Sequence, residues 1–139
     1  MTDPDLFAKK LALIETCVHE LRTLGRPAEI PTDLLQERFA EHTLQIAIQA
    51  VLDVASHIVS DERLGEPRTN RELVDLIARD GWLPFELADT MRRMVGFRNI
   101  LVHGYDVVDV AIVQDVVEHR LDDLLAFVSI IRRRAAHGR

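Results

Sequence analysis

Apolar residues recur along the chain at steps of three and four, which is the spacing of one face of an α-helix. Glycine, proline and helix-capping residues separate the apolar segments, and strand-like alternation is not convincing in any window. The expected helices cover about residues 2–25, 32–60, 69–81, 83–104 and 109–135. The pattern therefore predicts an all-α, five-helix bundle.

Two of the expected helices, the second and the fifth, are long. The apolar stripe of the second is widened by Ala47 and Val54, which is typical of a central helix packed on two sides. We expect these two long helices to pack antiparallel, with the others around them. Their stripes are Leu44, Ala47, Ile48, Val51, Val54, Ala55 and Ile58, and Val113, Val117, Leu121, Leu124, Val128 and Ile131.

The size of the chain, 139 residues, predicts a single domain, residues 1–139, with a flexible tail at about 133–139. A lone cysteine, Cys17, lies in an apolar helix face, which indicates a buried thiol in a reducing compartment. The first residues lack the pattern of a secretion signal, and membrane-spanning apolar stretches are not evident. We expect a cytoplasmic protein without a membrane partner.

The net charge of −6 argues against a general nucleic-acid coat protein, but it leaves room for a local positive site. Residues 92–98, RRMVGFR, contain three arginines and no acid, and residues 132–134 are RRR. The second cluster suits the end of a helix, where cations favour the helix dipole, or a patch that RNA approaches.

The segment GFRNILVHGY, residues 96–105, places Arg98, Asn99, His103 and Tyr105 within an apolar run. One interpretation is an ordinary helix end, with His103 near the dipole and Arg98 in a surface ion pair. The other is a site that cleaves RNA without a metal: a histidine moves protons, an arginine binds the phosphate, and Asn99 hydrogen-bonds His103 or a phosphate oxygen and fixes its orientation. Arg98 and His103 differ in direction by roughly 140° on a regular helix, so they converge only where the helix unwinds or where a second copy contributes.

A polar line on the second helix consists of Arg38, His42, Gln45, Gln49 and Asp53, at steps of three and four. This line is either a solvated face or a wall of the active groove or of a dimer contact. Asp53 and His57 are one turn apart, a spacing that more often gives a salt bridge than a metal site. The sequence predicts neither a metal site nor a cofactor.

The residues from Arg98 to Tyr105 have the form R-x4-H-x-Y, which resembles the signature of the HepT toxins within the HEPN superfamily. The resemblance extends over about residues 5–132 and includes LQIAIQAVLDVASHIV on the second expected helix. It implies a HEPN-type bundle that dimerises, with the two R-x4-H sets facing each other as a metal-independent ribonuclease. Arg98, His103 and Asn99 are then the catalytic candidates.

The resemblance also implies a partner. HepT toxins pair with a minimal nucleotidyltransferase antitoxin, MntA, which transfers AMP from ATP to the motif tyrosine, here Tyr105. An AMP group two residues from His103 would compete with RNA phosphate for Arg98 and block the cleft. The alternative is a non-catalytic nucleotide- or substrate-binding partner of a nucleotidyltransferase, which the acidic net charge fits slightly better.

Overall fold

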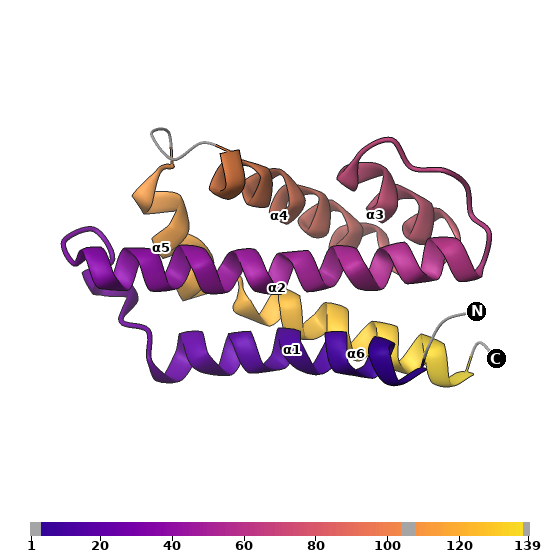
Figure 1. The fold of residues 1–139 in the computed structure, drawn as a ribbon, viewed down its shortest axis with the longest axis horizontal. Helices are drawn as coiled ribbons and strands as arrows, with labels where there is room; N and C mark the ends of the chain where they lie inside the picture. The colour runs from indigo at the N-terminus through magenta and orange to yellow at the C-terminus, as the bar shows by residue number, and fades with distance from the viewer. Residues whose placement is uncertain (1–3, 104–107, 138–139) are drawn as a thin grey trace.

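The computed structural model describes residues 4–103 and 108–137, and these form a helical bundle without a strand (Figure 1). The all-α prediction is therefore confirmed for the described residues. The helices are α1 (Pro4–Thr23), a 3-10 turn η1 (Pro27–Glu29), α2 (Leu34–Asp61), α3 (Asn70–Arg79), α4 (Phe85–His103), α5 (Val110–His119) and α6 (Leu121–His137).

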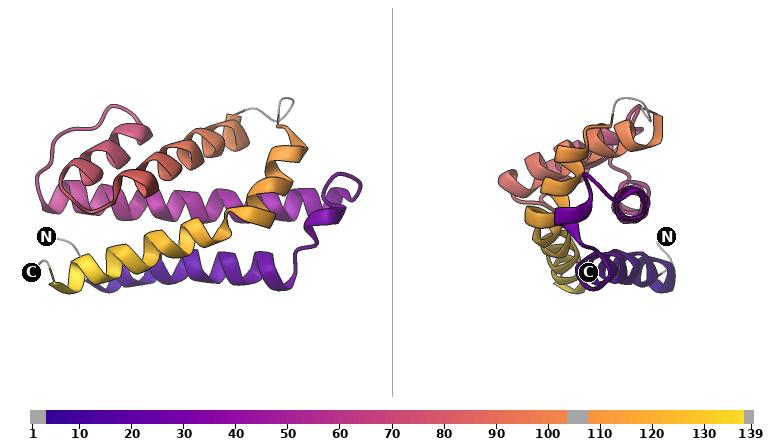
Figure 2. Two further views of the ribbon diagram at one scale, coloured as in Figure 1. Left: turned by 180° about the vertical axis from the view of Figure 1, so that it is seen from behind. Right: turned by 90° about the vertical axis from the view of Figure 1, so that its left-hand side faces the viewer.

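The 28-residue helix α2 is the centre of the bundle. α1 and α6 lie on one side of it, and α3 and α4 lie on the other (Figures 1 and 2). Every position of the apolar stripe expected on this helix is buried. The most apolar window of α2 is long enough to cross a membrane, but 61% of it is buried within the bundle, which is how a core helix behaves.

The long antiparallel pair of the bundle is α1 with α2, not α2 with the last helix as expected (Figure 1). α6 runs in the same direction as α2 and packs against α1 and α4 (Figures 1 and 2). The short connection between residues 23 and 34 forces α1 and α2 to reverse direction, so they become neighbours.

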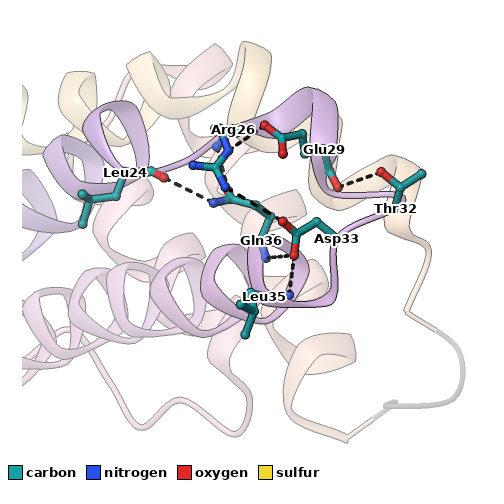
Figure 3. A network of polar contacts seen from close by, with 7 residues as sticks. All are labelled: Leu24, Arg26, Glu29, Thr32, Asp33, Leu35 and Gln36. Atoms are coloured by element: carbon teal, nitrogen blue, oxygen red, sulfur yellow. Dashed lines mark hydrogen bonds and ion pairs between the residues drawn. The ribbon is translucent and has the colours of Figure 1, made fainter.

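A polar network fixes this reversal at one end of the bundle (Figure 3). Asp33 caps α2 by accepting a hydrogen bond from the backbone N–H of Leu35 at 2.9 Å. The buried Gln36 accepts from the backbone N–H of Arg26 at 2.7 Å and donates to the carbonyl of Leu24 at 3.4 Å. A single side chain thus satisfies two backbone groups of the turn, which holds α1 and α2 in register.

The capping box predicted for α3 is present: Thr69 accepts from the backbone N–H of Glu72, and Glu72 accepts from the backbone N–H of Thr69. The predicted stop at Gly81 is also confirmed. Gly81 has a φ of +87°, a conformation that favours glycine, and the chain turns there from α3 into α4.

The last expected helix is divided in two, because α5 ends at His119 and α6 begins at Leu121. Its predicted inner face is nevertheless buried throughout. The division lets α5 cross the end of the bundle while α6 follows α1 (Figure 2). Asp122 and Asp123 lie in the first turn of α6, where carboxylates favour the helix dipole.

Two arginines of the 132–134 run fasten α6 to the bundle. Arg132 makes a bidentate ion pair with Glu15 of α1, at 2.7 and 2.8 Å. Arg134 lies over the ring of Trp82 at 5.1 Å and donates to the carbonyl of Asp80 at 3.4 Å. Residues 133–137, where a flexible tail is expected from the sequence, lie in α6, which extends to His137.

Candidate functional site

The last two turns of α4 contain the described part of the predicted site. Arg98 is half-buried and Asn99 is exposed on the neighbouring face. Leu101 is buried at 5% exposure, whereas Ile100 is 44% exposed. Helix periodicity explains the difference, because Leu101 follows Met94 and Val95 on the buried face and Ile100 does not.

The guanidinium of Arg98 points at α2. Its Nη2 donates a hydrogen bond to the side-chain oxygen of Gln49 at 2.5 Å, across 49 positions of sequence. Its Nε is buried and has no hydrogen-bond partner among the described residues. Arg98 forms no ion pair with any residue in the described ranges, so its positive charge is not neutralised by a described carboxylate.

The other two arginines of the 92–98 cluster are engaged differently. Arg92 pairs with Asp75 of α3 at 2.5 Å, and Arg93 pairs with Asp89 one turn away at 3.0 Å. These two arginines are therefore balanced by carboxylates. Arg98 is the arginine of the cluster that is held by an uncharged group.

A second link connects this contact to α1. The side-chain nitrogen of Gln49 donates to Asp53 at 2.9 Å, and the ammonium of Lys10 pairs with the other oxygen of Asp53 at 2.9 Å. Burial raises the pKa of Asp53, but the hydrogen bonds from Lys10 and Gln49 and the nearby positive charges outweigh it and hold the pKa below its usual value. Asp53 is thus a stable carboxylate near neutral pH.

An open pocket of about 240 Å³ lies at this junction of α1, α2 and α4. Three of the five residues of the polar line predicted on α2 take part: Gln45, Gln49 and Asp53 line the pocket, whereas Arg38 and His42 are exposed and lie outside it. Three residues of the line therefore form part of a pocket wall and two lie on the solvated face, and the interpretation of that wall as part of an active groove stays a prediction. The lining residues are Lys10, Leu13, Gln45, Ile46, Gln49, Ala50, Asp53 and Arg98.

The remaining site candidates lie outside the described part of the molecule. α4 includes the backbone of His103, but the side chain of His103 and the whole of Gly104 and Tyr105 are not among the described residues. The convergence of Arg98 with His103, the role of Asn99 beside it, and the modification of Tyr105 remain predictions.

The described side chains do not form a metal-binding set. Among the side chains that the structure describes, which exclude those of His103 and His137, no three of His, Cys, Asp or Glu gather as a set of metal ligands. Asp53, the carboxylate nearest to Arg98 in the network, is engaged by Lys10 and Gln49. The described groups at this pocket are suited to binding an anion through Arg98.

Sequence reasoning missed Lys10 altogether and did not identify what Gln49 contacts. The spacing of Gln49 and Asp53, one helical turn apart, is a signal for their hydrogen bond. The contact of Gln49 with Arg98 has no local signal, because it depends on how α4 packs on α2.

The chain is similar in sequence to known proteins. The sequence model of the HepT-like family, which is described as ribonuclease HepT-like, matches residues 14–131. A protein named mRNA nuclease HepT, from Shewanella oneidensis, is 31% identical over 129 residues, which cover 92% of this chain and 97% of that protein. A protein named tRNA nuclease HepT, from Aphanizomenon flos-aquae, is 36% identical over 74 residues, which cover 53% of this chain and 50% of that protein.

A solved structure has the same fold over nearly its whole length. It is the tri-AMPylated HEPN toxin of Shewanella oneidensis in complex with an MNT antitoxin. The TM-score is 0.87 at 30% sequence identity, and the match covers 96% of this chain and 99% of that one.

Proposed function

The chain belongs to the HepT-like ribonuclease family, and we propose that it is the RNA-cleaving toxin of a toxin–antitoxin pair that acts in the cytoplasm. The observation that carries the proposal is the environment of the Arg98 guanidinium. Its guanidinium lines an open pocket and is held by a neutral amide, and no carboxylate among the described residues pairs with it. Such an arginine is available to a phosphate oxygen.

RNA supplies its own nucleophile, the 2′-hydroxyl. In the proposed reaction the 2′ oxygen forms a bond to the adjacent phosphorus while the bond from phosphorus to the 5′ oxygen breaks. His103 accepts the proton of the 2′-hydroxyl, and a proton is returned to the 5′ oxygen, which leaves a 2′,3′-cyclic phosphate and a 5′-hydroxyl. Arg98 stabilises the charge that develops on the phosphate oxygens, and Asn99 orients His103 or a phosphate oxygen.

Two copies of the chain complete the site in this proposal. Arg98 points toward α2 of its own chain, whereas residue 103 lies five positions farther along α4, roughly 140° around the helix. A symmetric dimer brings the Arg98 of one protomer and the His103 of its partner to one cleft.

The test is an RNA cleavage assay in excess EDTA. We expect cleavage by the unmodified protein and a loss of at least about a hundredfold in Arg98→Ala and His103→Ala, because each removes a group that acts in the transition state. Arg68→Ala, which removes an exposed arginine from the loop before α3, is the matched control. Equal rates for all variants would refute the site, and cleavage at a 2′-deoxy position would exclude the 2′-hydroxyl as nucleophile.

The proposed regulation is AMP transfer to Tyr105 by an MntA-like nucleotidyltransferase antitoxin. The phenolic oxygen of Tyr105 attacks the α-phosphorus of ATP, pyrophosphate leaves, and the phenolic proton is released. A structural relative supports AMP transfer as the modification, because it is a tri-AMPylated HEPN toxin in complex with an MNT antitoxin.

Intact-protein mass spectrometry with the antitoxin and ATP tests the regulation. We expect the mass to rise by one or more AMP units and RNA cleavage to fall as the mass rises. Tyr105→Phe should abolish the gain, and modification of that variant to the same extent would assign another acceptor.

A further inference from the structure

The polar chain behind Arg98 joins three helices through three contacts. Lys10 of α1 pairs with Asp53 of α2, Gln49 donates to Asp53, and Arg98 of α4 donates to Gln49, with donor–acceptor distances of 2.9, 2.9 and 2.5 Å. All four side chains line the pocket of about 240 Å³. We propose that Gln49 is a positioning residue that holds the Arg98 guanidinium in place for phosphate, an inference that rests on the proposed function.

The chemistry of the neighbours fixes the orientation of the Gln49 amide. A guanidinium can only donate hydrogen bonds, and an ionised carboxylate can only accept them. Gln49 must therefore present its oxygen to Arg98 and its nitrogen to Asp53. The ammonium of Lys10 holds the second oxygen of Asp53, so that the carboxylate stays in place as the acceptor.

A neutral acceptor has a consequence that a carboxylate would not have. A carboxylate at this position would form a bidentate ion pair with Arg98 and neutralise it, as Glu15 does with Arg132. Gln49 restrains one guanidinium nitrogen, and the positive charge remains.

Asp53 is linked to Arg98 through Gln49. Asp53 supplies the negative charge that orients the amide, but Gln49 stands between it and the arginine. Lys10 in turn balances Asp53. Arg98 is thereby oriented through two hydrogen bonds by a carboxylate that does not pair with it.

Two substitutions of Gln49 separate positioning from a structural role. Gln49→Leu removes the acceptor and keeps the volume, and Gln49→Glu keeps an acceptor but adds a charge. We expect Gln49→Leu to lower kcat for RNA cleavage by about tenfold to a hundredfold, because the guanidinium loses its orientation. We expect Gln49→Glu to raise KM for RNA by about tenfold, because the new carboxylate competes with phosphate for Arg98. Gln114→Glu, the same change on α5, is the matched control and should leave cleavage unchanged.

A second readout does not depend on cleavage. In ¹⁵N NMR of the full chain, rotation about the Nε–Cζ bond of Arg98 is slowed when the guanidinium is held, and Arg98→Lys identifies its signals. We expect slow rotation in the unmodified protein and in Gln49→Glu, and fast rotation in Gln49→Leu.

The two readouts distinguish the possible failures. Fast rotation in the unmodified protein, or slow rotation in Gln49→Leu, would refute the positioning role. Gln49→Glu cleaving RNA like the unmodified protein would refute the need for a neutral acceptor. Loss of NMR restraint in Gln49→Leu without RNA cleavage by the unmodified protein would instead leave the positioning intact and refute the ribonuclease.

Discussion

Arginines at two places in this molecule are held in opposite ways. On α6, Arg132 is paired with the carboxylate of Glu15, and Arg134 is stacked on Trp82 and bonded to the carbonyl of Asp80. On α4, Arg98 is held by the amide of Gln49 and pairs with no described carboxylate. Arg132 thus fastens a helix with its charge balanced by a carboxylate, whereas Arg98 has no described carboxylate partner and lines an open pocket.

This contrast assigns the two basic clusters seen in the sequence. The RRR run at 132–134 is chiefly a structural clamp, because two of its three arginines are used to hold α6 against α1 and the turn before α4. In the 92–98 cluster, Arg92 and Arg93 pair with carboxylates, and Arg98, which has no described carboxylate partner, is the one we propose to bind phosphate. A cluster of like charges in a sequence can therefore be assigned to a ligand only after the ion-pair partners of its residues are known from the structure.

The largest expected effect is on RNA cleavage, when the same Arg→Lys change is made on α4 and on α6. Arg98→Lys keeps the charge but loses the planar fork, and we expect RNA cleavage to fall by about tenfold or more. Arg132→Lys makes the same change on α6 and should leave the cleavage rate within about twofold, because it does not contact RNA in this account. A single-turnover cleavage assay of both variants measures this, and an equal loss in both would erase the distinction.

The next effect concerns stability alone. Arg134→Ala removes the stacking on Trp82 and the hydrogen bond to Asp80, and we expect the free energy of unfolding to fall by about 1–2 kcal/mol. Arg133→Ala, the exposed neighbour, is the control and should change it by less than about 0.5 kcal/mol. Urea unfolding measures both, and equal values for the two variants would show that the Trp82 contact contributes nothing.

The smallest effect is a pH dependence of the clamp on α1. Hydrogen bonds from Arg132 lower the pKa of Glu15 below its ordinary value of 4.5, although burial opposes this. The pair therefore stabilises the fold fully above that ordinary pKa, and its contribution is lost as the pH falls through the lowered folded-state pKa.

Glu15→Gln measures that contribution. Because both side chains are more than two-fifths exposed, at 46% and 43%, we expect a loss below about 1 kcal/mol at pH 7. The difference from the unmodified protein should shrink as the pH is lowered below 4.5. A difference that grows toward acid pH would contradict the assignment of the lowered pKa to this ion pair.

Much of the fold is encoded in local patterns that the sequence displays. The apolar stripes on α2 and on the last two helices are buried as predicted, because a period of 3.6 residues fixes which positions share a face. The Thr69 capping box and the Gly81 stop are likewise local signals. The break at Arg120 carries no glycine or proline, and the directions of α2 and α6 depend on packing between distant segments.

The candidate site was only partly predictable for the same reason. Arg98 was identified from its motif, and Gln45, Gln49 and Asp53 from their common face on α2. That Gln49 holds Arg98, and that Lys10 holds Asp53, depends on contacts between α1, α2 and α4 that no local pattern encodes.

The central claim is that Arg98, rather than the arginines of α6, meets RNA phosphate. The most direct measurement is the salt dependence of the affinity for an uncleavable 2′-O-methyl RNA. Loss of one phosphate contact lowers the slope of log K against log salt by about 0.7 for a single strand. We predict this decrease for Arg98→Ala and an unchanged slope for Arg132→Ala. An unchanged slope for Arg98→Ala, with a decrease for Arg132→Ala, would contradict the account.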